Sequence, residues 1–242
     1  MSVLREAALT LRPSADDKHG PLVPMMVALT VLTGVVDAAS YLKLGHVFVA
    51  NMTGNVVFLG FALAGAGGLS AVASLLALAS FLLGALAGGW LSARHTDHRG
   101  RLLRDATVAQ AGLIALAFTL SLVASEPLGE PVRYTLVVLL ALAMGVQNAA
   151  ALRLAVPELT TTVLTRTLTG LASQASFVGG PGSQVGRRSI AVFAILLGAF
   201  CGALLVLKVS VAAALVVALV LAGALAFAAS ALSGSDAAWT RS

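Results

Sequence analysis

The chain has 242 residues, of which 59% are hydrophobic and only 10% are charged. Soluble domains carry about 25% charged residues, so this composition excludes a soluble globular protein and indicates an integral membrane protein. The net charge of +5 is spread over too few charged residues to indicate nucleic-acid binding, and an excess of Lys and Arg is what orients membrane helices. The single cysteine, Cys201, excludes a disulfide framework and a Cys-x-x-Cys site.

A polar tail, residues 1–20, precedes the first apolar run. It resembles the basic start of a signal peptide. The run that follows is long, contains Asp37 and begins a repeated unit, so cleavage would destroy the repeat. We therefore expect a retained cytoplasmic tail.

Eight apolar segments follow the tail. In chain order they are residues 22–44, 47–66, 69–93, 106–125, 134–156, 159–176, 189–207 and 209–232. A helix needs about 20 apolar residues to cross the hydrocarbon core, and six of the segments meet that length with little interruption. Segments 47–66 and 159–176 are interrupted by Asn and Thr residues. The predicted fold class is therefore an all-α polytopic membrane protein with six spans and two polar, broken segments.

The distribution of Lys and Arg distinguishes two topologies. If all eight segments cross, the basic residues divide seven to seven between the two sides. If segments 47–66 and 159–176 enter and leave on the same side, the division becomes eleven to three. The positive-inside rule favours this second arrangement, with both termini and the 94–104 loop in the cytoplasm of a bacterium and the spans in its inner membrane. Eight spans remain the alternative, because Gly and Thr are also common in ordinary membrane helices.

The two halves of the chain share sequence features. Gly-Val-x-(Asp/Asn)-Ala-Ala begins at Gly34 and again at Gly145, and Gly-x-x-x-Gly begins at Gly84 and again at Gly198. Such self-similarity indicates an internal repeat, and an odd number of crossings in each half makes the repeats inverted. The predicted division is a tail (1–20), repeat 1 (21–125), an external loop (126–133), repeat 2 (134–232) and a cytoplasmic tail (233–242).

The same strings carry a resemblance to a known family. They are Leu-Gly-His-Val-Phe-Val-Ala-Asn-Met-Thr-Gly-Asn at 44–55, Gly-Val-Gln-Asn-Ala at 145–149 and Thr-Thr-Val-Leu-Thr at 161–165. The chain resembles the YoaK family, a DUF1275-type group of bacterial membrane proteins of unknown function, over roughly residues 22–232. Arg166 departs from the pattern of the first half, where Gly54 follows Thr53. The resemblance implies a multi-pass membrane protein and no particular activity.

Asp37 is the first candidate functional residue. An ionisable group inside a span costs ~2.5–3.5 kcal/mol on insertion scales and usually faces a partner or a water-filled cavity. One interpretation is a carboxylate that binds a proton or cation. The other is a structural residue that bonds Ser40 or a helix end and holds the repeats in register. Asn148 occupies the corresponding position in the second half, so we expect the two side chains to meet.

The polar residues of the broken segments are predicted to line a path for a solute or ion. Asn51 and Asn55 are four residues apart, a spacing that places both on one face of a helix. The alternative for the threonines is hydrogen bonding between helices, and for Arg166 it is snorkelling to the surface. The predicted path residues are Asp37, Asn51, Thr53, Asn55, Gln147, Asn148, Thr161, Thr165 and Arg166.

These features predict a transporter or channel for a small solute, with proton or cation coupling through Asp37. The alternative is a non-transporting membrane scaffold or assembly factor, in which the same residues only lock the fold. A lone Asp without a matched carboxylate, His or nucleophile is a poor catalytic set, so we expect no enzyme, cofactor or metal. The expected partners are the lipid bilayer, a small solute or ion, and a second copy of the chain through the Gly-x-x-x-Gly helices.

Overall fold

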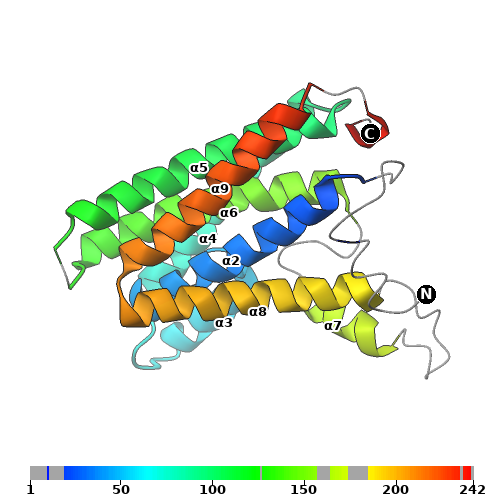
Figure 1. Ribbon diagram of the computed structural model, residues 1–242. Helices are drawn as coiled ribbons and strands as arrows, with labels where there is room; N and C mark the ends of the chain where they lie inside the picture. The colour runs from blue at the N-terminus through cyan, green and yellow to red at the C-terminus, as the bar shows by residue number, and fades with distance from the viewer. Residues whose placement is uncertain are drawn as a thin grey trace.

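The computed structural model describes residues 10, 19–125, 127–156, 164–173, 185–234 and 237–240. Within these residues the chain forms eight α-helices and one short 3-10 helix (Figure 1). They are α2 (Leu22–Lys43), α3 (Met52–Leu63), α4 (Ala71–Arg94), α5 (Arg99–Val123), α6 (Glu130–Leu154), α7 (Leu164–Ser173), α8 (Val185–Lys208), α9 (Val211–Leu232) and η2 (Ala238–Thr240).

Six helices are long and apolar enough to cross a membrane: α2, α4, α5, α6, α8 and α9. Their 22 to 25 residues give lengths of about 33–38 Å at 1.5 Å per residue, enough for a core of about 30 Å. The six predicted spans are present as long apolar helices. Within segment 47–66 the helix α3 has 12 residues, and within the described part of segment 159–176 the helix α7 has 10 residues. The helix α3 reaches about 18 Å, less than the thickness of the core.

Consecutive long helices run in alternating directions, with α3 toward one end of the bundle and α7 toward the other (Figure 1). The start of α2, the 3-10 helix η2 and the α4–α5 connection lie at the α7 end. Arg99 fixes this arrangement, because its guanidinium donates to the carbonyl oxygens of Leu154 and Trp239 and lies 3.1 Å from Nδ1 of His19. The start of α2, the start of α5, the end of α6 and η2 are thereby joined at one end.

Glycines bring two pairs of helices into backbone contact. A Cβ atom on Gly34 would approach the backbone of α8 closer than 3.0 Å, and one on Gly198 would do the same to α2. Gly84 and Gly145 stand in the same relation between α4 and α6. Small residues at these positions allow membrane helices to pack closely. Since the Gly-x-x-x-Gly faces are already used within the chain, they do not offer the surface that the predicted homodimer requires.

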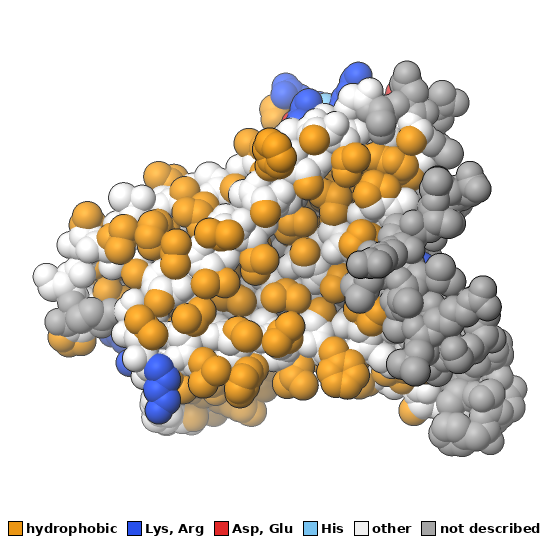
Figure 2. Space-filling model, in the orientation of Figure 1, with side chains coloured by type: hydrophobic (Ala, Val, Ile, Leu, Met, Phe, Trp, Pro, Cys, Tyr) orange, Lys and Arg blue, Asp and Glu red, His pale blue; other side chains and the backbone are white. Residues whose placement is uncertain are grey.

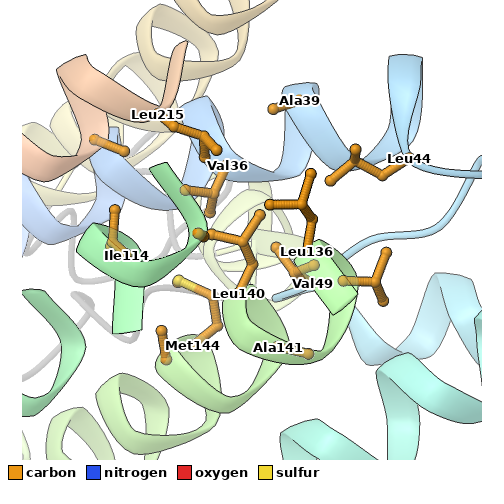
Figure 3. Close-up of a cluster of buried hydrophobic side chains, with 14 of the residues drawn as sticks. Val36, Ala39, Leu44, Val49, Ile114, Leu136, Leu140, Ala141, Met144 and Leu215 are labelled. Atoms are coloured by element: carbon orange, nitrogen blue, oxygen red, sulfur yellow. The ribbon is translucent and has the colours of Figure 1, made fainter. Parts of the chain in front are cut away.

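The core lies between α2, α5, α6 and α9 and also includes part of the connection between α2 and α3. Figure 3 shows Leu44 and Val49 of this connection beside Val36, Leu136 and Leu140. Non-helical backbone at membrane depth is tolerated only where protein or water surrounds it. Leu44 and Val49, both 0% exposed, meet that condition where they pack into the core.

The outer surface is apolar along the middle of the bundle. On the face in Figure 2, hydrophobic side chains cover the middle, and Lys and Arg lie toward the two ends. Large exposed hydrophobic residues recur along α4 and α8, for example Leu83, Leu86, Phe193 and Phe200. A continuous apolar surface of this kind marks a membrane contact, and the predicted lipid-facing helices are therefore present.

Candidate functional site

The connection that leads into α3 is held by Asp37 of α2. Its Oδ1 accepts hydrogen bonds from the backbone N–H groups of Val49 and Ala50, each at 2.9 Å. A buried carboxyl group and two buried amides satisfy one another in this way. Asp37 therefore fixes the backbone immediately before α3. Ser40, named as a partner from the sequence, donates to the backbone carbonyl of Asp37 instead.

The expected contact between the side chains of Asp37 and Asn148 is not observed. Within the described residues no hydrogen bond joins the two side chains, and Nδ2 of Asn148 donates to the carbonyl of Met144, one turn earlier in α6. The reason is local. Asn148 lies inside a helix and reaches a carbonyl of that helix. Asp37 faces a non-helical segment and accepts hydrogen bonds from its N–H groups.

Asn55 closes the same connection from its other side. Its Oδ1 accepts from the backbone N–H of Phe48 at 2.8 Å, and its Nδ2 donates to the Phe48 carbonyl at 2.6 Å. The side chain is fully buried. Asn51, in contrast, is exposed and precedes the first residue of α3. The helical spacing that predicted a common face for the two asparagines does not apply, because Asn51 stands outside the helix.

A groove of about 620 Å³ opens beside the first turn of α3. Its polar lining comes from three predicted path residues, Asn51, Thr53 and Thr165, all of which are exposed. The first two belong to the start of α3 and the third to the first turn of α7. The groove thus brings both broken segments together. The other lining residues described are Ala50, Met52, Gly54, Val57, Phe58 and Phe81.

The chemistry of the groove follows from its lining and from the start of α3. The first N–H groups of a helix lack partners within it, and the helix dipole gives that end a partial positive charge. The lining adds two hydroxyl groups and one amide, and it includes no charged side chain among the described residues. Such a surface offers hydrogen bonds to a polar solute while its aromatic and aliphatic residues keep part of the wall apolar.

An aromatic cluster forms one wall of the groove. The rings of Tyr41 and Phe48 stack at 5.0 Å between centroids, and Phe48 lies 5.8 Å from Phe58, which also lines the groove. Gly54 makes room for this cluster, because a Cβ atom there would lie 2.8 Å from the Phe48 ring. These aromatic residues are not among the predicted path residues. Phe48 lies within the 44–55 string, and Tyr41 and Phe58 lie three residues outside it.

Gln147 lies away from the groove. It accepts a hydrogen bond from Gln110 of α5 and donates to Oγ1 of Thr33 in α2 at 3.0 Å. All three side chains are buried. These two hydrogen bonds join three of the long helices, α2, α5 and α6. Gln147 therefore serves hydrogen bonding between helices, which was the alternative to lining a path.

The second broken segment is held by a buried arginine. Arg188 of α8 is 5% exposed, and its Nη1 donates to the carbonyl of Gly170 in α7 at 2.7 Å. This residue lies just before segment 189–207 and is not among the predicted path residues. Arg166 is exposed, and Thr161 lies outside the described residues. Among the residues that the structure describes, no group of three His, Cys, Asp or Glu side chains is arranged to hold a metal ion.

Comparisons with known proteins agree with this membrane architecture. The family model described as "Protein of unknown function (DUF1275)" matches residues 25–228. The chain is also similar to the UPF0700 transmembrane protein YoaK of Bacillus subtilis (strain 168), with 33% identity over 153 residues. That alignment covers 63% of this chain and 66% of the relative, just under two thirds of its length. No solved structure matches the chain.

Proposed function

This chain belongs to the DUF1275 family, and we propose that it is a transporter or channel that carries a small polar solute through the groove between α3, α4 and α7. The resemblance found in the sequence is confirmed, and the chain is a multi-pass membrane protein with six candidate spans. The family description assigns no activity, so the proposal depends on the groove.

One observation carries the proposal: residues of both short helices, from the start of α3 and from α7, line one groove. Interrupted helices whose N-terminal ends face a cavity at membrane depth are typical of solute carriers, where the free N–H groups bind the solute. Thr53 and Thr165 add hydroxyl groups on the two sides of the groove. We assign solute binding to these groups and to Asn51.

We also propose that the two halves are inverted repeats. The support is a reciprocal pattern of packing: Gly34 meets α8 and Gly145 meets α4, while Gly198 meets α2 and Gly84 meets α6. The pairs correspond in sequence, since 145 − 34 is 111 and 198 − 84 is 114. Three spans in each half give opposite orientations. Such symmetry allows one half to move against the other around a fixed central site.

The proposed orientation places both chain ends in the cytoplasm. The described basic residues at the α7 end include Arg94, Arg99 and Arg153, whereas Lys43, Arg133 and Lys208 lie at helix ends on the opposite side. The whole-sequence division of eleven to three supports this orientation by the positive-inside rule.

Asp37 takes a positioning role in this proposal. Its Oδ1 is occupied by two backbone N–H groups, and the next residue after that pair, Asn51, lines the groove. Coupling of transport to protonation of Asp37 stays a prediction. The scaffold alternative gains no observation of its own, because an exposed polar groove is not needed to lock a fold.

Proteoliposomes test the proposal. Purified protein would be reconstituted, and uptake of a panel of small polar solutes and osmotic swelling would be measured with and without a pH gradient. We expect at least one solute to enter faster than in empty vesicles, and Thr53→Val to slow its entry. Thr119→Val is the matched control, since Thr119 is exposed on α5 and bonds its own helix. No uptake of any panel member by folded, oriented protein would contradict the proposal.

A further inference from the structure

A second pocket lies at the end of the bundle where α2 ends and α4 and α6 begin. It has a volume of about 210 Å³ and is formed by the connection after α2, the residues before α4 and the first turn of α6. Its polar lining consists of His46, Ser70, Glu130, Arg133 and Tyr134. None of these belongs to the groove described above or to the path predicted from the sequence.

Two opposite charges line this pocket without pairing with each other. Glu130 and Arg133 stand three residues apart in the first turn of α6. In the part of the chain that the structure describes, the side chains in ion pairs within 4.0 Å are those of His95, Arg104 and Asp105. The Nε atom of Arg133 is buried and has no hydrogen-bond partner there. A buried donor without a partner costs about 1–3 kcal/mol, which a bound acceptor would recover.

Hydroxyl groups hold the carboxylate in place. Tyr134 Oη donates to Glu130 Oε1 at 3.0 Å, and Ser70 Oγ lies 3.4 Å from Tyr134 Oη. Since α4 begins just after Ser70, these contacts connect Glu130 to a second helix. The carboxylate is thus oriented by Tyr134 rather than by the guanidinium. The two charged groups both line the pocket and lie more than 4.0 Å apart.

We propose that this pocket binds a small zwitterion of the α-amino acid class. The ligand carboxylate bonds to the Arg133 guanidinium, whose forked donors match that group, and the ligand ammonium bonds to Glu130. A simple anion would leave Glu130 unpaired, and a simple cation would leave Arg133 unpaired. The pocket volume of about 210 Å³ suits a ligand with few heavy atoms, since drug-sized ligands occupy pockets of about 300–1,000 Å³.

The site does not depend on the proposed transport function. His46 contacts Tyr41 edge-on at 5.4 Å, Tyr41 stacks with Phe48, and Phe48 stacks with Phe58, which lines the groove. A ligand in the pocket would therefore lie next to the groove, separated from it by the aromatic cluster. Binding can be measured without any assumption about movement across the membrane.

Binding to the purified full-length protein in detergent tests the proposal. Glycine and alanine are the probes, and acetate and methylammonium, which each carry one of the two charges, are the comparisons. Calorimetry and thermal melting on the wild-type protein should show binding of the amino acids at least about tenfold tighter than of either half-ligand, which corresponds to about 1.4 kcal/mol. This comparison requires no variant.

Variants then assign the two charges. Arg133→Gln and Glu130→Gln should each weaken alanine binding about tenfold or more, because each removes one charged partner. Tyr134→Phe should weaken it less, since it frees the carboxylate without removing it. Lys208→Gln is the control, an exposed cation at the same end of the bundle and outside the pocket. The proposal would be overturned if acetate bound as tightly as alanine. It would also be overturned if acetate bound Glu130→Gln more tightly than alanine binds the wild type, or if neither amino acid bound at millimolar concentration.

Discussion

Replacement of Asp37 tests how the connection before α3 is held. In Asp37→Leu, the backbone N–H groups of Val49 and Ala50 lose their common acceptor, and both residues are buried. Each stranded buried donor costs about 1–3 kcal/mol, so the two together predict a loss of about 2–6 kcal/mol in the free energy of unfolding. In Asp37→Asn, the amide oxygen can accept the same two bonds, so the expected loss is smaller, about 1–2 kcal/mol.

Thermal melting of the purified variants measures both changes. Asp97→Leu is the control, because Asp97 is exposed in the α4–α5 connection, and it should melt with the wild type. Solute flux into proteoliposomes adds a second readout. The positioning role predicts that Asp37→Asn keeps its flux and its pH dependence. A stable Asp37→Leu protein would refute the role assigned to the carboxylate, and a folded Asp37→Asn protein without pH-dependent flux would assign coupling to it instead.

Three further predictions concern packing, the connection before α3 and topology. Gly88→Val should destabilise the fold, because its Cβ would lie 2.8 Å from the Cβ of Ala149. Gly89→Val on the same helix meets open space and should melt like the wild type. Equal melting of the two variants would contradict the close contact of α4 and α6. Asn55→Ala should lose about 1–3 kcal/mol by stranding the Phe48 amide, and an unchanged melting temperature would show that the bond contributes nothing. In a Cys201→Ala background, a cysteine at Gly129 should react with an impermeant reagent added outside cells and one at Thr96 should not; the reverse result would reject the proposed orientation.

The spans and their contacts were largely predictable from the sequence. Long apolar runs predicted the six long helices because a membrane imposes a minimum length. The glycines at 34, 84, 145 and 198 were visible as small residues at helical spacing, and the structure places them at the closest helix contacts. What the sequence did not determine was the choice between contacts within one chain and contacts between two chains, since both require the same small residues.

The roles of individual polar residues were less predictable. Asp37 and Asn55 stood out as polar groups in apolar segments, but both bind backbone atoms of residues 48–50. The conformation of that segment depends on the helices around it and leaves no periodic pattern. Arg188 lies just before the predicted segment 189–207 and was not predicted as a site residue, although it binds the carbonyl of Gly170. A long side chain can reach a buried carbonyl from a helix end, and sequence position alone does not reveal it.

Cross-linking of α3 to α7 tests the central claim most directly. Thr53 and Thr165 line the same groove, so cysteines at both positions, in a Cys201→Ala background, should be joined by a short reducible thiol cross-linker. The account predicts that the cross-link stops solute flux in proteoliposomes and that reduction restores the flux of the unmodified double-cysteine protein, while either single cysteine with the same reagent slows the flux without stopping it. Complete cross-linking with unchanged flux would contradict the claim that the solute passes between the two short helices.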